Sequence, residues 1–168
     1  VAEPFAMASA DIEKAAVVLL VGCNIRHELP LLHQRLLKAG KRGARIFAIN
    51  PVDFEFAFKL AGRRIVAPSK LPGALAAIAQ AAGAGLPSSL DVDGDESSKL
   101  VAEAIKAAGE NAVILFGEMA EGHAAASHLH AAARALARAT GAKLNRIPQG
   151  ANAVGLAALG LLPKVQGR

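Results

Sequence analysis

The stretch VVLLVGCNIRHELP, residues 17–30, decides the fold. It opens with five apolar residues, passes through Gly22 and a polar loop, and enters a segment with the spacing of an amphipathic helix. Continuous apolar runs are typical of strands that are buried on both faces of a parallel sheet. In such sheets, a strand that leads through a glycine turn into a helix presents a loop at the ligand-facing edge. Any binding chemistry of the chain is therefore expected at this turn.

The same plan continues along the chain. Pro30 and Gly40 bracket the helix, and a second apolar strand over 44–49 stops at Asn50-Pro51. A strand-helix-strand unit of this length is expected to form a right-handed parallel crossover. Further strands are predicted at 64–67, 112–116 and 143–147, and helices at 71–82, 97–108 and 120–140. These elements predict a three-layer, Rossmann-like α/β fold with a mostly parallel sheet, or sheets, flanked by helices.

Residues 86–98, LPSSLDVDGDESS, interrupt this apolar pattern with proline, serine, glycine and acidic residues. They predict a mobile acidic linker between a first α/β subdomain over 1–85 and a second over 99–168. The sequence does not decide whether the two halves share one sheet. The linker favours two packed subdomains.

Length and composition restrict the class of protein. The 168 residues are 53% hydrophobic, which is enough for one domain or two small ones with a core. A net charge of +5 from dispersed basic residues, without any Tyr or Trp, argues against nucleic-acid binding. No apolar run approaches the roughly 20 residues that span a bilayer, and the first residues lack the pattern of a secretion signal. We therefore expect a cytoplasmic protein. Because the chain begins at Val1 and not at methionine, we also expect it to be a segment of a longer protein.

The single cysteine limits redox and metal chemistry. It excludes a disulfide within the chain and a four-cysteine zinc or iron-sulfur site built from this chain alone. No residue that would activate Cys23 as a nucleophile is identifiable from the sequence. A structural, buried cysteine is expected.

The histidines give no strong signal for a site. His27 and Glu28 could form an acid-base pair, but adjacent residues at a helix start point apart, and an interaction of Glu28 with the amino end of the helix is favoured. His123, His128 and His130 lack the spacing of a metal site, and surface or packed histidines are expected instead.

Two further groups of residues remain open to interpretation. Four carboxylates have no partner that the sequence identifies, so no catalytic pair is predicted. They are Asp53, Glu55, Glu118 and Glu121. Phe54, Phe56 and Phe58 recur at every second position, and this stripe either packs one face or docks another domain.

Four short blocks also carry a family resemblance. The loop in residues 20–30 resembles the glycine-asparagine loop of the molybdopterin oxidoreductase superfamily. More closely, it resembles the large iron-sulfur subunit of respiratory NADH:quinone oxidoreductase. Residues 43–51, GARIFAINP, occupy the place of that superfamily's second strand and Asp-Pro turn. Residues 112–117, AVILFG, and 149–155, QGANAVG, look like its later segment, so nearly the whole chain is covered.

The resemblance implies which residues belong to a cofactor site. In the catalytic relatives these loops help to hold a pterin-guanine dinucleotide. By position, the implied cofactor-binding residues are Gly22, Asn24, Asn50, Gly150 and Asn152, which we interpret as vestigial. The resemblance implies no catalytic residue and no metal ligand in this chain.

This chain departs from the catalytic pattern after its second strand. Asn50-Pro51 is followed by Val52, where those enzymes commonly have Asp-Pro followed by arginine. A carboxylate and a cation that could bind a nucleotide are therefore missing from the turn after the second strand. The respiratory subunit fits better, and in it this region is thought to lack the cofactor and to serve as architecture.

The resemblance therefore implies a structural, non-catalytic segment of the peripheral-arm subunit of an enzyme that transfers electrons from NADH to quinone. The chain itself would hold no cofactor, and the parent subunit would bind its iron-sulfur clusters in an upstream cysteine-rich region. The expected partners are the rest of that subunit and other peripheral-arm subunits of complex I, at the cytoplasmic face of the inner membrane. Two alternatives stay open. One is a segment of a molybdopterin-dependent, formate dehydrogenase-like oxidoreductase that still binds the dinucleotide, and the other is a free-standing α/β protein that binds a small molecule.

Overall fold

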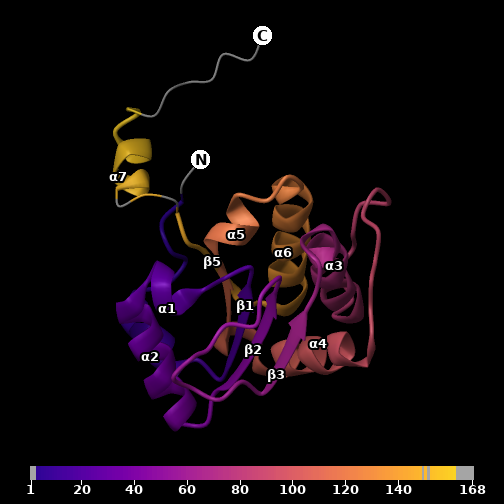
Figure 1. Cartoon of the computed structure of the whole chain (residues 1–168), viewed down its shortest axis with the longest axis horizontal. Coiled ribbons are helices and arrows are strands. Elements are labelled where there is room, and N and C mark those ends of the chain that lie inside the picture. The colour runs from indigo at the N-terminus through magenta and orange to yellow at the C-terminus, as the bar shows by residue number, and fades with distance from the viewer. Residues whose placement is uncertain (1–2, 149, 151, 162–168) are drawn as a thin grey trace.

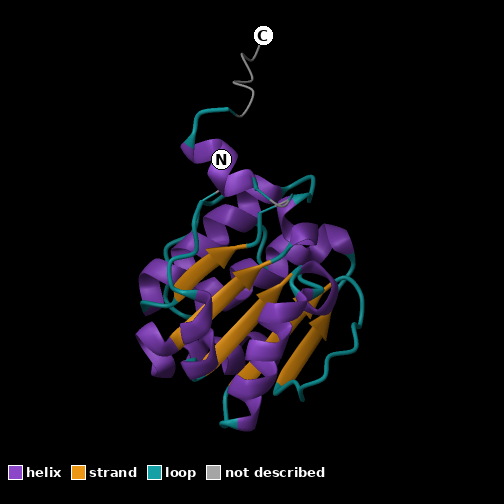
Figure 2. Cartoon of the chain, turned by 90° about the vertical axis from the view of Figure 1, so that its left-hand side faces the viewer, coloured by secondary structure: helices purple, strands orange, loops and turns teal. Residues whose placement is uncertain are grey.

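In the described residues, five parallel strands form one sheet in the order β3-β2-β1-β4-β5. Figure 1 labels β1, β2, β3 and β5 of this sheet. The computed structural model describes residues 3–148, 150 and 152–161. In Figure 2 the strand arrows run in one direction and helices cover the sheet. The fold class predicted from the sequence, a parallel α/β sheet flanked by helices, is confirmed. The strands are β1 (Val17–Val21), β2 (Arg45–Asn50), β3 (Gly62–Ile65), β4 (Ala112–Phe116) and β5 (Lys143–Arg146).

The central strand β1 pairs with β2 on one side and with β4 on the other. Its register places Val17 beside Arg45 of β2 and beside Ala112 of β4. All five residues of β1 are buried, because helices cover both faces of the sheet at its centre. This explains why the strand is a continuous apolar run rather than an alternating one.

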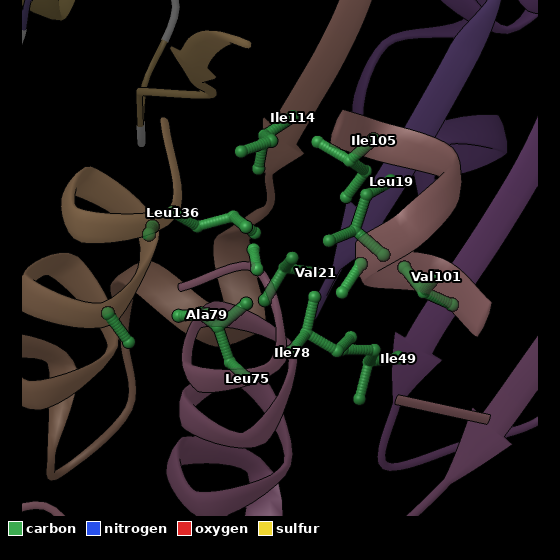
Figure 3. Packing of buried hydrophobic residues seen from close by; sticks show 14 of the residues in the cluster. Leu19, Val21, Ile49, Leu75, Ile78, Ala79, Val101, Ile105, Ile114 and Leu136 are labelled. Atoms are coloured by element: carbon green, nitrogen blue, oxygen red, sulfur yellow. The ribbon is translucent and has the colours of Figure 1, made fainter. Parts of the chain in front are cut away.

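Two apolar clusters bury the two faces of the sheet. Leu19 and Val21 of β1 pack with Ile78 of α3 in the cluster that also contains α4 and α6 (Figure 3). Val18 and Leu20 point to the opposite face, towards η1, α1 and α2, because successive side chains of a strand alternate. The helices are η1 (Ser9–Lys14), α1 (Ile25–Glu28), α2 (Pro30–Lys41), η2 (Pro68–Lys70), α3 (Leu71–Ala81), α4 (Glu96–Ala108), η3 (Gly109–Asn111), α5 (Glu118–Glu121), α6 (Ala126–Thr140) and α7 (Ala153–Ala158). Within the described part of the chain, no helix combines the length and the apolar composition needed to cross a membrane.

The two halves on either side of residues 86–98 contribute to the same sheet. β4 from the second half pairs with β1 from the first half along the whole of both strands. The expectation of two packed subdomains is therefore corrected, because the sheet is continuous across the expected boundary. The acidic stretch is a crossover connection from β3 and α3 to α4.

Residues 86–98 are held against the elements that they connect. Leu90 is buried in the apolar cluster under α3. The N–H of Asp93 donates to the Gly73 carbonyl at 3.1 Å, and the Arg64 guanidinium donates to the Asp93 carbonyl at 2.7 Å. Asp95 caps α4 in a capping box with Ser98. The composition of residues 86–98 predicted a mobile linker, because composition does not reveal these contacts.

The helix predicted over 120–140 is two helices, α5 and α6, separated by residues 122–125. The N–H of Gly122 closes α5 by donating to the Glu118 carbonyl at 2.8 Å. The His123 ring Nδ1 then accepts from the N–H of Ala125 at 2.9 Å, a local contact that competes with helix continuation. Gly141 ends α6 in the left-handed conformation with a φ of 79°, as the sequence predicted.

Candidate functional site

The strand order defines where a ligand would bind in this architecture. The chain turns outward from β1 in both directions, with β2 on one side and β4 on the other. In open parallel sheets, ligands bind outside the carboxyl ends of the strands where the order reverses. That position lies between the turn after β1, at Gly22, and the turn after β4, at Gly117. We call it the switch point.

The two turns at the switch point pack directly against each other. A Cβ atom at Gly117 would overlap Cys23, and one at Gly22 would lie 2.7 Å from the backbone nitrogen of Ala120. The turns are also hydrogen-bonded, since Met119 N–H donates to the Gly22 carbonyl at 3.1 Å. Gly22 has a φ of 53°, so its own conformation also favours glycine. Both glycines therefore permit close approach of backbone to backbone.

Asn50, at the carboxyl end of β2, fixes the turn after β1. Its side chain is 1% exposed, and its Oδ1 accepts from the N–H of Cys23 at 2.8 Å while its Nδ2 donates to the Cys23 carbonyl at 3.3 Å. One amide side chain thus satisfies both backbone polar groups of a buried residue. These two bonds hold Asn50 against the loop 22–24.

Glu28, at the end of α1, turns back into the switch point. Its Oε1 accepts from the N–H of Asn24 at 2.5 Å, and its Oε2 accepts from the N–H of Glu118 at 3.0 Å. Burial raises the pKa of Glu28, opposed by the hydrogen bonds from the Glu118 and Asn24 backbone. The sequence favoured an interaction of Glu28 with the amino end of the helix that begins at Pro30. In the structure Glu28 instead binds the amino end of the preceding short helix α1, and the bridge to Glu118 was not predicted.

Cys23 is fully buried beside this carboxylate. Its Sγ lies 3.8 Å from Glu28 Oε2. Burial raises the pKa of the Cys23 thiol well above its ordinary value, and the negative charge of Glu28 raises it further. A thiol held in this way is a poor nucleophile, in agreement with the structural role expected from the sequence.

Asn24, Gly150 and Asn152 make no comparable contacts. Asn24 is half-buried, and its side chain forms no capping hydrogen bond with α1. Gly150 and Asn152 are exposed in the segment between β5 and α7, and Figure 1 shows α7 standing away from the sheet. Among residues 3–148, 150 and 152–161, no hydrogen bond joins this segment to the loop 22–24 or to Asn50. Their assignment to a vestigial cofactor site stays a prediction.

A second polar cluster lies where β4 and β5 end, and the sequence did not reveal it. Glu121, only 12% exposed, accepts two hydrogen bonds from the Arg146 guanidinium at 2.7 and 2.8 Å, and its Oε2 lies 3.1 Å from His130 Nε2. Burial alone would raise the pKa of Glu121, but Arg146 and His130 together lower it. Glu3 extends the cluster through Arg134 and Arg146. Only the adjacency of β4 and β5 could have predicted this pairing of a carboxylate that the sequence leaves isolated.

The phenylalanine stripe packs against α2 through two of its three rings. Phe56 and Phe58 stack with centroids 5.2 Å apart, and Phe58 lies 5.1 Å from the ring of His33. Phe54 lines an open cleft of about 690 Å³ together with Arg26, and Phe56 and Phe58 line the same cleft. The segment carries no strand, so its alternation reflects packing rather than a pairing edge.

The histidines do not form a metal centre in the described residues. His123 is outside α6, where its Nε2 lies 2.8 Å from the Pro68 carbonyl, and His130 is bound to Glu121. In the part of the chain that the structure describes, no group of three or more His, Cys, Asp or Glu residues is arranged to hold a metal ion.

Strand order, parallel pairing and the glycine turns define a doubly wound α/β domain of the dinucleotide-binding type. Comparison with known proteins identifies the family. The chain belongs to the molybdopterin oxidoreductase family, whose pattern it matches over residues 2–167.

The chain spans a small part of the length of the similar curated proteins that it matches. It is 35% identical over 159 residues to the G subunit of the NADH-quinone oxidoreductase of Mycobacterium bovis, and equally to that of Mycobacterium tuberculosis. These matches cover 94% of this chain but only 17% of each relative. The family resemblance drawn from the sequence is thereby confirmed.

A solved structure supports the fold alone. The formyltransferase/hydrolase complex (FhcABCD) from Methylorubrum extorquens, determined with methylofuran, contains a chain that superposes with a TM-score of 0.61 at 20% identity. The match covers 93% of this chain and 44% of that one.

Proposed function

We propose that this chain is a structural segment of the large iron-sulfur subunit of a respiratory NADH:quinone oxidoreductase, and that it performs no chemistry itself. The observation that carries the proposal is the direct packing of the two switch-point turns. In dinucleotide-binding relatives of this fold, the phosphates approach backbone at such turns. Here Gly117 is against Cys23, and the space for that approach is filled by the protein itself.

The residues present do not fit a pterin-guanine dinucleotide. The polar atoms of the Asn50 side chain are engaged by the Cys23 backbone, and Gly150 and Asn152, within the described residues, are not hydrogen-bonded to the switch point. No arginine directly follows Asn50-Pro51, so the cation that commonly stands there in the catalytic relatives is missing from this turn. We therefore assign the dinucleotide no role in this chain.

Electron transfer would belong to other parts of the parent subunit. A four-cysteine iron-sulfur cluster needs ligands that this chain, with one buried cysteine, does not supply. The 35% identity to the two mycobacterial subunits supports partners among the peripheral-arm subunits and the rest of a subunit of that length. We place the assembled protein at the cytoplasmic face of the inner membrane.

Metal and pterin analysis of the intact parent subunit tests this proposal against a molybdopterin-dependent oxidoreductase. We expect iron without stoichiometric molybdenum or tungsten, and no extractable pterin. Either metal at one equivalent per subunit, with pterin, would overturn the structural role.

A variant in the intact complex tests the architectural role directly. Gly117→Val places side-chain atoms into Cys23, so we expect less assembled complex, with unchanged turnover per assembled complex. Gly85→Val is the matched control, because a Cβ atom there meets no other atom within 4 Å. Normal assembly with a large loss of turnover in Gly117→Val would indicate a working site instead.

A further inference from the structure

The Glu28 carboxylate is bound as a small anion would be bound. Its two oxygens accept backbone N–H groups from different parts of the chain, Asn24 after β1 and Glu118 after β4. Glu28 takes part in none of the ion pairs among the described residues, so these N–H groups are its principal partners. Charge-assisted hydrogen bonds of this kind are about twice as strong as those between neutral groups.

The position of these donors is more informative than their number. They lie at the switch point, on the two turns between which this fold binds the charged part of a ligand. Neither donor belongs to the residue that supplies the carboxylate, and the two are 94 positions apart in sequence, from Asn24 to Glu118. The bond to Glu118 therefore depends on the fold, whereas the bond to Asn24 is local, within one helical turn.

We propose that Glu28 is an intramolecular ligand that occupies the oxyanion position of the switch point and excludes a phosphate group from it. This inference rests on the proposed function, since it explains how a dinucleotide-type fold remains closed without a dinucleotide. The carboxylate satisfies the two N–H groups that a phosphate would otherwise engage, and its charge repels a second anion. Removal of the carboxylate should therefore free the N–H groups of Asn24 and Glu118 to bind an external oxyanion.

Glu28→Ala in the 168-residue chain tests the proposal, with Cys23 as a built-in reporter. Cys23 is the single cysteine, is fully buried and lies 3.8 Å from the carboxylate, so its alkylation rate measures opening of the switch point. We expect Glu28→Ala to raise that rate by about tenfold, because two charge-assisted hydrogen bonds are lost. Inorganic phosphate and acetate, each compared with chloride at equal ionic strength, should restore slow alkylation and raise the Tm of Glu28→Ala.

The wild type and two further variants serve as controls. The wild type should show no phosphate-specific protection, and neither should Glu96→Ala, whose side chain is 88% exposed on α4. Glu28→Gln should fold, because its amide still fills the space, and should be alkylated faster without rescue by phosphate. If Glu28→Ala fails to fold in every buffer, the alkylation rate of Cys23 in Glu28→Gln tests the proposal in its place. A rate in Glu28→Gln equal to that of the wild type would overturn the proposal.

Three results for Glu28→Ala have defined meanings. Rescue by phosphate supports the proposal. Rescue by acetate alone would overturn it, because the site would then be too small for a phosphate group. The absence of rescue by either anion would overturn it as well. None of these results bears on the metal and pterin content of the intact subunit, so failure of this inference is distinguishable from failure of the proposed function.

Discussion

At the scale of single residues, Asn50 and Asn24 of the candidate site should contribute differently to stability. Asn50→Ala removes the side chain that serves the buried Cys23 backbone, and we expect a loss of about 2–3 kcal/mol in the free energy of unfolding. Asn24→Ala should cost less than about 1 kcal/mol, because its half-buried side chain makes no capping bond. Urea unfolding of both variants checks this, and equal losses would contradict the structural assignment of Asn50.

The Glu121 cluster gives a prediction about pH. The pKa of Glu121 is lowered in the folded chain, so its contribution to stability is present above the unfolded pKa of about 4.3 and is lost as the pH falls through the folded value. Glu121→Gln removes this dependence while it keeps the shape of the side chain. We therefore expect the stability difference between wild type and Glu121→Gln to shrink as the solution is acidified below about pH 4.3. A difference that stays constant in acid would exclude an ionised pair with Arg146.

At the scale of the elements, the close approach of the two turns can be separated from backbone strain. Gly22 and Gly43 both have positive φ, at 53° and 96°, but only Gly22 faces another element, since a Cβ atom at Gly43 meets nothing within 4 Å. Gly43→Ala should cost about 1 kcal/mol from strain, and Gly22→Ala a further 1–3 kcal/mol or so from overpacking against α5. Thermal unfolding of the pair measures the difference, and equal costs would mean that the turns do not support each other.

The cap of α4 is a second test at this scale. Asp95 accepts hydrogen bonds from Ser97 and Ser98, and these bonds, the Ser97 bond first, lower its pKa. Asp95→Ala should therefore lower the free energy of unfolding by about 1 kcal/mol, whereas the exposed Glu96→Ala should change it little. If the two variants behave alike, residues 86–98 are not anchored through this cap.

What the sequence predicted and what it missed follow from the range of the interactions. The strands over 17–21 and 112–116 are visible as apolar runs, because burial on both faces requires that composition locally. The bond between Asn50 and Cys23 joins neighbouring strands, so the strand-helix-strand pattern already indicates their proximity. The bridge from Glu28 to Glu118 depends on β4 lying beside β1, which no local pattern encodes.

At the scale of the whole molecule, the shared sheet determines how the chain folds. β1 has its neighbours in both halves, and the apolar cluster on one face combines α3 from the first half with α4 and α6 from the second. Removing either half would expose a long apolar strand edge and one side of this cluster to water. Stability should therefore be a property of the complete chain rather than of its parts.

Separate expression of residues 1–85 and 99–168 tests this conclusion. We expect neither piece to show a cooperative unfolding transition, because each lacks the partner that buries its side of the sheet, while the complete chain unfolds in a single transition. Far-UV circular dichroism during urea titration measures both, and mixing the pieces should recover part of the ordered signal if β1 and β4 pair as they do in the intact chain. Cooperative unfolding of residues 1–85 alone would restore the two-subdomain interpretation, since β1, β2 and β3 would then suffice as a unit without β4.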